Sequence, residues 1–224
     1  MSSNNRLDHP SVSQSTRIEH PPGLRERQKK ARYERILASA RSLFNTLDFE
    51  SATMAAIAEH AEVSTPTVFN YFNTKDQLLL ALVLQVHHET QKWVHSFQPQ
   101  PSSSLPDALC DFLSMYTKKS LKTINRQTWR HVESIRIRMP DSQFVKQYDA
   151  LTGEMFDDFF GFLKHTVNNE GIDGAQLEPV AEIIFNHWAT LFVELVKNET
   201  VDLDEHIGRL RADLTALIGM MRIG

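Results

Sequence analysis

Helical periodicity that runs through nearly the whole chain is the feature that most constrains its fold. From residue 24 onward, apolar side chains recur at intervals of three or four, and no stretch sustains the two-residue alternation of a half-buried strand. Only eight glycines and nine prolines occur among 224 residues. The pattern predicts an all-α fold, with two short helices between residues 53 and 72 and longer helices at about 24–47, 74–97, 105–124, 126–138, 142–169, 176–198 and 203–221.

Cysteine usage and apolar run length restrict the compartment. Cys110 is the single cysteine, so no disulfide can form within the chain, and a reducing compartment fits. The N-terminus lacks the apolar core of a signal peptide. The longest apolar run, at 78–84, is too short to cross a bilayer. We therefore expect a cytoplasmic protein without a membrane partner.

The distribution of charge matters more than its total. The net charge of −4 argues against nucleic acid, yet residues 17–35 hold seven basic and three acidic side chains. The chain after residue 84 holds 14 basic and 19 acidic residues. A basic N-terminal stretch on an acidic body suits a polyanionic partner. A plain solvated helix face would carry the same charges, and the charges alone do not separate the two readings.

Composition divides the chain into three regions. Residues 1–23 are rich in Ser, Asn, Gln, His and Pro, and we expect a disordered tail there. Residues 24–73 form the first three predicted helices, and residues 74–224 form a larger helical body with a Pro/Ser linker at 98–104.

The two short helices have the spacing of a helix-turn-helix. Such helices cross near a right angle and need a small residue at their contact, and Ala58 stands there. Apolar residues that would close this core are Ile57, Ala61, Val63, Val68 and Phe72. The positions that remain facing outward are Thr65, Thr67, Phe69, Asn70 and Tyr71.

Helix-capping residues stand at the expected places. Thr53 and Ser64 precede the two short helices as N-caps, and Pro66 falls in a first turn, where its missing N–H does no harm. Thr74 with Gln77 forms a capping box for the fourth helix.

The run from Thr53 to Leu79 resembles the DNA-binding signature of the TetR/AcrR family, and residues 36–44 resemble that family's first helix. The resemblance covers about 50 residues and includes a lysine at the start of the fourth helix. It implies an N-terminal three-helix helix-turn-helix DNA-binding domain and a larger C-terminal helical ligand-binding and dimerisation domain.

The resemblance also implies individual roles. Residues 65–67 would approach base edges, Asn70 could pair with adenine, and Lys75 would neutralise a phosphate. Phe69 and Tyr71 match aromatic positions near the DNA backbone, although Phe69 lacks the usual hydroxyl. The two caps would present N–H groups to phosphates, and basic residues of the first helix would add sequence-independent attraction. The complete expected DNA-binding set is Arg25, Lys29, Lys30, Arg32, Thr53, Ser64, Thr65, Pro66, Thr67, Phe69, Asn70, Tyr71 and Lys75.

Two positions depart from the family pattern. Glu62 stands in the turn where the family usually has glycine, and Asp48 replaces a common glycine after the first helix. If the turn is left-handed, a non-glycine residue there costs about 1–2 kcal/mol.

The last two predicted helices carry apolar stripes that suit helix–helix packing. The family resemblance implies a homodimer interface there, while packing within one chain is the alternative. The expected interface residues are Ile184, Trp188, Leu191, Leu195, Ile207, Leu210, Leu214 and Leu217. A dimer would place two recognition helices on the half-sites of a palindromic operator in double-stranded DNA.

The segment at 142–169 is apolar on two faces, which is typical of a helix in the middle of a domain. The family resemblance implies an effector pocket there, and a filled core is the alternative. The expected walls are Trp93, Phe112, Met115, Tyr116, Trp129, Phe156, Phe160 and His187. Arg130, His131 and Arg136 are further candidate polar anchors.

The sequence contains no G-x-S-x-G, G-x-x-x-x-G-K-S/T, G-x-G-x-x-G or H-E-x-x-H motif, so we expect neither an enzyme nor a cofactor or metal site. His87, His88 and His95 share one side of a helix without a completing carboxylate or thiolate. The expected function is a transcriptional repressor released from its operator by a small hydrophobic or aromatic effector. The alternative is a nucleoid-associated or scaffold protein with the same DNA-binding head and a protein partner.

Overall fold

The computed structural model describes residues 23–47, 49–100, 103–167 and 174–221. The expected disordered tail, apart from Gly23, lies outside the described residues, as does Asp48. Every regular element in the described ranges is a helix, which confirms the all-α prediction. None of these helices is long and apolar enough to cross a membrane.

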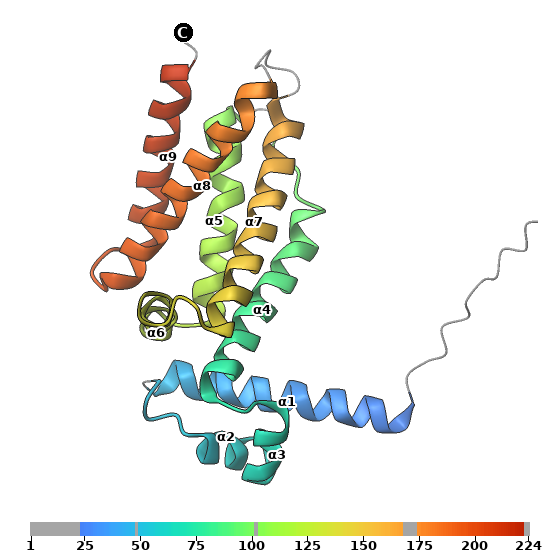
Figure 1. Ribbon diagram of the computed structural model, residues 1–224. Helices are drawn as coiled ribbons and strands as arrows, with labels where there is room; N and C mark the ends of the chain where they lie inside the picture. The colour runs from blue at the N-terminus through green and yellow to red at the C-terminus, as the bar shows by residue number, and fades with distance from the viewer. Residues whose placement is uncertain (1–22, 48, 101–102, 168–173, 222–224) are drawn as a thin grey trace, which may run out of the picture.

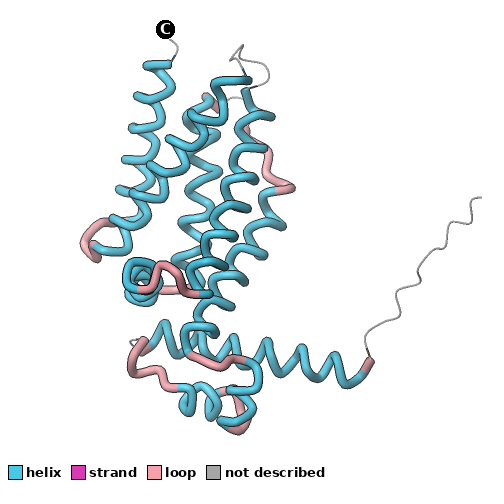
Figure 2. Tube along the Cα trace, viewed as in Figure 1, coloured by secondary structure: helices cyan, strands magenta, loops and turns pink. Residues whose placement is uncertain are grey.

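The helices follow the predicted order, with ends that differ from expectation by at most a few residues. They are α1(Leu24–Thr46), α2(Met54–His60), α3(Thr65–Tyr71), α4(Lys75–Val94), α5(Leu105–Thr123), α6(Arg126–Arg138), α7(Gln143–Val167), α8(Gly174–Lys197) and α9(Leu203–Met221). Short loops connect most of them (Figure 2).

The helices form a small head and a taller body (Figure 1). The head holds α1, α2 and α3, and α1 lies across the foot of the body with its N-terminal half projecting past α3. Helix α4 rises from the head into the body beside α5 and α7, α9 lies against α5 and α8 at the opposite edge of the body, and α6 lies crosswise between body and head.

The head is joined to the body by a continuous apolar core and by hydrogen bonds between α1 and the start of α6. One hydrophobic cluster extends from Ile57 in the head to Val132 of α6. At the C-terminal end of α1, the Asn125 side-chain amide and the Thr128 hydroxyl both donate to the Phe44 carbonyl, at 3.0 and 3.1 Å. Carbonyls at a helix end need such partners, so these bonds fix α6 on the head.

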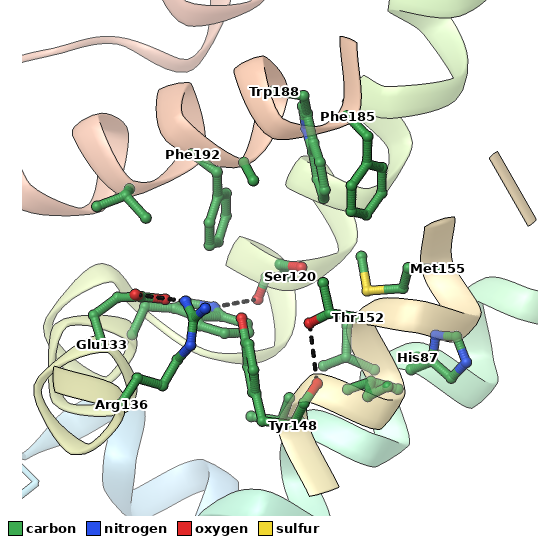
Figure 3. Close-up of a pocket in the computed structure, with 16 residues that line it drawn as sticks. His87, Ser120, Glu133, Arg136, Tyr148, Thr152, Met155, Phe185, Trp188 and Phe192 are labelled. Atoms are coloured by element: carbon green, nitrogen blue, oxygen red, sulfur yellow. Dashed lines mark hydrogen bonds and ion pairs between the residues drawn. The ribbon is translucent and has the colours of Figure 1, made fainter. Parts of the chain in front are cut away.

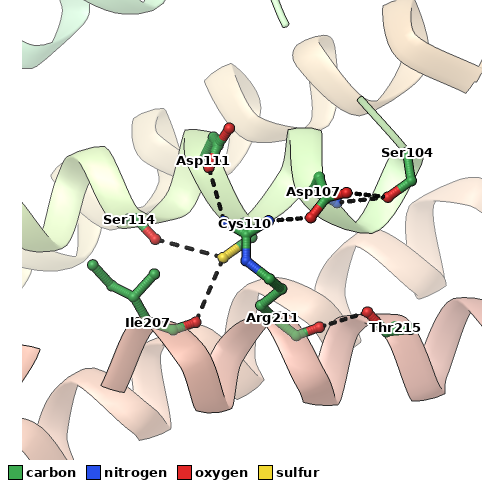
Figure 4. A network of polar contacts seen from close by, with 8 residues as sticks. All are labelled: Ser104, Asp107, Cys110, Asp111, Ser114, Ile207, Arg211 and Thr215. Carbon is green, nitrogen blue, oxygen red and sulfur yellow. Dashed lines mark hydrogen bonds and ion pairs between the residues drawn. The ribbon is translucent and has the colours of Figure 1, made fainter. Parts of the chain in front are cut away.

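A second cluster of contacts fastens α9 to α5 (Figure 4). The Arg211 guanidinium donates to the carboxylates of Asp107 and Asp111. Beside it lies Cys110, which is fully buried with its Sγ 3.7 Å from the Ser114 hydroxyl oxygen. Burial raises the pKa of the Cys110 thiol. Cys110 therefore belongs to the core.

The same packing uses most of the apolar stripe that we expected at a dimer interface. Six of the eight side chains are at most 6% exposed within a single chain: Ile184, Trp188, Leu191, Leu195, Leu210 and Leu214. Ile207 and Leu217 are half-buried. The stripe therefore describes the packing of α8 and α9 within one chain, because a side chain already buried there has no surface to offer a partner.

Candidate DNA-binding surface and ligand cavity

Helices α2 and α3 pack through the small residues that the sequence predicts. Ile57, Ala58, Ala61 and Val68 are at most 1% exposed. The expected caps form: the Thr53 hydroxyl accepts from the Ala56 N–H, and the Ser64 and Thr74 side chains accept from N–H groups in the first turns of α3 and α4. Ser104 and Asn125 cap α5 and α6 in the same way. Local sequence thus fixes where α3 begins.

The turn between α2 and α3 is left-handed at Glu62, whose φ is 52°. The Val63 N–H donates to the Ala58 carbonyl at 3.0 Å, and the Glu62 N–H donates to the Glu59 carbonyl at 3.0 Å. This is a helix ending in which the left-handed position normally favours glycine. The geometry therefore matches the expectation that Glu62 is strained.

Helix α3 presents an uncharged, mixed polar and aromatic face to solvent. Phe69 is 45% exposed, and Pro66 and Asn70 are exposed as well. Thr65 and Thr67 are half-buried at the start of the helix, and the Ser64 and Thr67 hydroxyls lie 2.8 Å apart. An exposed phenylalanine beside an exposed amide suits a surface that meets a partner.

Tyr71 orients α3 against α1. Its hydroxyl donates to the Lys29 carbonyl at 3.2 Å, and its ring lies 6.2 Å from that of Tyr33. The neighbouring Phe72 lies closer to Tyr33, with ring centroids 5.2 Å apart. These contacts hold the projecting half of α1 beside α3.

The result is a groove that joins the basic residues of α1 to the outward face of α3. Its lining residues are Arg25, Gln28, Lys29, Arg32, Thr67, Asn70 and Tyr71. The three cationic side chains are exposed, and none takes part in an ion pair among the described residues. Lys30, in contrast, lies 3.8 Å from the Glu34 carboxylate. All of these residues except Gln28, which is uncharged and precedes Lys29, belong to the expected DNA-binding set.

Lys75 lies differently from the expected phosphate contact. Its ammonium donates to the carbonyls of Phe49 and Glu50, at 2.6 and 3.3 Å, and lies 4.3 Å from the centre of the Phe49 ring. The side chain is 20% exposed. A phosphate contact would require Lys75 to leave these partners, whose present effect is to hold the loop between α1 and α2.

A cavity of about 100 Å³ lies in the lower body, between α4, α6, α7 and α8. Three aromatic side chains of α8, Phe185, Trp188 and Phe192, project into it from one side, opposite Tyr148 and Met155 of α7 (Figure 3). The Trp188 indole N–H is satisfied by the Thr117 hydroxyl at 3.0 Å. The walls are therefore predominantly apolar and aromatic, as ligand sites are.

The polar groups of the cavity are few and partly unpaired. Arg136 of α6 donates to the Glu133 carboxylate at 2.8 Å and stacks on the Tyr148 ring at 4.6 Å. The Arg136 Nε atom is buried and has no hydrogen-bond partner among the described residues. Burial raises the pKa of Tyr148 well above its usual range, so its phenol stays protonated.

His87 of α4 supplies a second unpaired atom. It is 3% exposed, and its Nε2 lies 3.1 Å from the Glu154 carboxylate. Burial lowers the pKa of His87, although the bond to Glu154 works in the opposite direction. Because a carboxylate only accepts, neutral His87 carries its hydrogen on Nε2, which leaves Nδ1 as a buried acceptor without a partner.

This cavity lies elsewhere than the expected pocket. Of the eight expected walls, only Trp129 lines it. Trp93 and Phe112 pack into an aromatic cluster with Phe97 and Phe162, and Phe156 stacks on Phe160. Tyr116 is buried, and Met115 is half-buried. The upper body is thus a filled core at these rings.

The residues expected as polar anchors of the pocket lie at different sites in the structure. Arg136 lines the cavity, whereas Arg130 donates to the Val196 carbonyl and the Glu199 carboxylate. His131 stacks on Phe49 of the head, with ring centroids 3.7 Å apart. His187 joins α8 to α9 through Asp213 at 2.8 Å. Among the described residues, no group of three or more His, Cys, Asp or Glu side chains could hold a metal ion.

Comparison with known proteins agrees with the geometry of the head. The family model described as "Bacterial regulatory proteins, tetR family" matches residues 36–82. The HTH-type transcriptional regulator UidR of Escherichia coli K12 is 39% identical over 51 residues, which are 23% of this chain. The aligned segment spans only 26% of UidR.

Solved structures share the fold across the body as well. A protein from Mesorhizobium loti assigned to the TetR family has a TM-score of 0.65 and 16% identity, over 86% of this chain and 98% of that one. A tetR-family regulator from Streptomyces coelicolor has a TM-score of 0.62 and 17% identity, over 85% of this chain and 82% of that one. Thermus thermophilus FadR, a TetR-family repressor in complex with lauroyl-CoA, has a TM-score of 0.56 and 19% identity, over 82% of this chain and 93% of that one.

Proposed function

Because residues 36–82 match the family model of the tetR bacterial regulatory proteins, we propose that the chain regulates transcription by binding duplex DNA through α3. The observation that carries this proposal is the groove between α1 and α3, where three cations without an ion-pair partner among the described residues lie beside Thr67 and Asn70. In this proposal residues 24–73 are the DNA-binding domain, and residues 74–224 regulate it.

Contacts to DNA divide by chemistry. Asn70 and Thr67 are uncharged, exposed or half-exposed, and reach base edges when α3 enters the major groove. Arg25, Lys29 and Arg32 approach the phosphates, which position the protein without reading sequence. The caps Thr53 and Ser64 offer backbone N–H groups at helix starts. Lys75 supports the head from within rather than contacting phosphate, because its ammonium is already occupied.

To test this proposal, the affinity of the protein for a labelled duplex of random sequence is measured by fluorescence anisotropy at a series of salt concentrations. Replacing Lys29 and Arg32 with alanine should reduce the slope of log affinity against log salt by about 2 for each protomer that binds the duplex, since each phosphate contact contributes about 0.9. The matched control replaces Lys118 and Lys122, exposed cations of α5 in the body. An equal loss in both variants would contradict a DNA site in the head.

We further propose a homodimer in which the outward faces of α8 and α9 meet a second copy. Ile183 and Met220 are exposed by 57% and 65%. On α9 small residues recur on one exposed stripe, at Gly208, Ala212, Ala216 and Gly219. Small residues let two helix backbones approach closely. Ala212→Glu should convert a dimer to a monomer in light scattering, and an unchanged mass would contradict this interface.

The cavity supports an effector that controls DNA binding, with repression in the absence of effector as the simplest outcome. Helix α6 supplies Trp129, Glu133 and Arg136 to the cavity, and the same helix holds the head through Asn125, Thr128 and His131. A ligand that favours one position of α6 changes the spacing of the two heads in a dimer on a palindromic operator.

A nucleoid-associated or scaffold protein controlled by a protein partner is the alternative. A filled body would favour it, whereas a cavity with unpaired polar atoms favours a small molecule. Release of bound duplex by a small molecule, measured by anisotropy, distinguishes the two. Release by none of a broad panel of apolar compounds would favour the alternative.

A further inference from the structure

The size of the cavity and the charges of its lining restrict what it can hold. We infer that its ligand is an uncharged molecule of about one aromatic ring that carries a hydrogen-bond acceptor, such as a carbonyl oxygen, bound at Arg136 and Tyr148. This inference deepens the effector role proposed above and rests on it.

Volume sets the ligand's size. The cavity of about 100 Å³ is somewhat smaller than the cavity of about 150 Å³ that is known to admit benzene in another protein. A single ring with a small substituent therefore needs a slight adjustment of the lining side chains, and long acyl chains or fused ring systems need a much larger rearrangement. The aromatic side chains of α8 offer ring faces and edges, and offset or edge-to-face contacts between rings are favourable.

The unpaired donor sets the ligand's polar end. Arg136 Nε is a donor that is buried without a partner, and a buried donor left unsatisfied is destabilising. The Tyr148 side chain stands beside the guanidinium and points into the space below the α8 rings (Figure 3). No described group accepts from or donates to its phenol. A ligand oxygen at this end satisfies both.

The opposite end of the polar lining reinforces this orientation. Neutral His87 offers only an acceptor toward the remainder of the site, so a carbonyl oxygen gains nothing there. The Thr152 hydroxyl already donates to the Tyr148 carbonyl, whereas Arg136 Nε is a buried donor that no described group satisfies. The acceptor therefore belongs at the Arg136 end.

Charge balance decides between a neutral ligand and an anion. The charged residues of the lining are Arg136 and Glu133, which already form a pair. The Glu133 side chain is only 14% exposed, so its charge is poorly solvated. A carboxylate ligand would compete with Glu133 for the same guanidinium and would bury a second negative charge beside it, which is costly.

The experiment compares three single-ring compounds of nearly equal size by titration calorimetry on the full chain: acetophenone, cumene and benzoate. Acetophenone should bind about tenfold more tightly than cumene, which lacks the oxygen, because one hydrogen bond to a charged donor is gained. Benzoate should bind more weakly than acetophenone. Equal binding of acetophenone and cumene, tighter binding of benzoate, or no binding of acetophenone at millimolar concentration would overturn the inference.

A charge-neutralising variant gives a sharper test. In Glu133→Gln the side chain keeps its shape but frees Arg136, so the preference should reverse and benzoate should bind more tightly than acetophenone. Glu182→Gln, which removes a charge from the exposed face of α8, is the matched control and should keep the original preference. An unchanged preference in Glu133→Gln overturns the inference.

Tyr148→Phe serves if the first variant does not fold, because it keeps the ring beneath Arg136. It should reduce the advantage of acetophenone over cumene several-fold, and an undiminished advantage overturns the role of the phenol. Duplex release is measured separately. Acetophenone that binds in this pattern without releasing DNA supports the ligand class and contradicts the effector role.

Discussion

The head and the cavity recognise their partners by opposite physical means. The head keeps its binding groups outside: Phe69 and Asn70 are exposed, and Arg25, Lys29 and Arg32 form no ion pair among the described residues. The cavity keeps its binding groups inside. Arg136 and Glu133 form an ion pair there, and the buried Arg136 Nε and His87 Nδ1 atoms have no hydrogen-bond partner among the described residues. Long-range, salt-sensitive attraction therefore belongs to the head, and short-range selection by shape and hydrogen bonding belongs to the body.

The largest expected contrast is the response to salt. Raising salt from about 50 to about 200 mM should weaken duplex binding by about a thousandfold or more if each dimer makes six or more phosphate contacts. Binding of an uncharged aromatic ligand should change less than about twofold, because the ligand has no charge to screen. The same protein sample, titrated with each partner across the salt series, tests this, and parallel salt slopes would break the contrast.

The next largest expected effect is that filling the cavity lowers ligand affinity without changing DNA binding by the head. Ala189 lines the cavity beside Trp188, and Ala189→Phe would occupy the space of a single ring. Ligand affinity should fall more than about tenfold, as a ligand must displace the new side chain. Binding of random duplex by the head should persist. Retained ligand affinity would place the ligand elsewhere.

Base reading by α3 should appear as a loss of selectivity rather than of attraction. Asn70→Ala should reduce the preference for a selected site by about 1–3 kcal/mol while leaving random-duplex binding nearly unchanged. Phe69→Tyr, which adds a hydroxyl for a phosphate, should strengthen binding to all sequences a few-fold. Competition between selected and random duplexes measures both. A uniform loss in Asn70→Ala would make Asn70 a backbone contact.

Acid should affect the body before the head. Burial lowers the pKa of both His87 and His206, so the unfolded chain binds more protons than the folded chain below about pH 6.5. The stability due to their neutral forms is present above that pH and lost as pH falls. The free energy of unfolding should drop by up to about 1.4 kcal/mol per pH unit for each histidine. Urea unfolding tests this, and His87→Gln should flatten the profile.

The smallest expected effect is in the head's turn. Glu62 adopts a left-handed conformation that costs about 1–2 kcal/mol for a side chain with a β-carbon. Glu62→Gly removes this strain but increases the entropy of the unfolded chain, so the net gain should be about 0.5–1 kcal/mol. Thermal unfolding should show a modest rise in Tm, and a fall would mean that Glu62 contributes an interaction beyond the turn.

The sequence predicted the head well because its determinants are local. Caps at Thr53 and Ser64 act within one turn, and Ala58 and Val68 lie ten residues apart on adjoining helices. The ends of α1 to α3 and the buried faces of the head follow from such neighbours. The position of the Lys75 side chain could not be predicted in this way, because it depends on the Phe49 carbonyl, which lies 26 residues away in the sequence.

The cavity escaped prediction because it depends on how distant helices line up. Phe112 and Phe192 have the same helical periodicity, yet one packs in a filled core and the other lines the cavity. Trp188 fits both a dimer stripe and a cavity wall on sequence alone. One signal was available: Glu133 and Arg136 stand three residues apart on a helix whose other face is apolar, which indicates a neutralised charge pair near a core.

Selection of duplexes from a random pool, followed by footprinting with the wild-type protein and with Asn70→Ala, tests most directly whether α3 reads DNA. We predict enrichment of a two-fold symmetric site whose half-sites lie about one helical turn apart, with Asn70→Ala losing preference at the same base pair in each half. Failure to enrich any sequence, or an identical selected site for a variant with the outward face of α3 replaced, would contradict DNA reading by this helix.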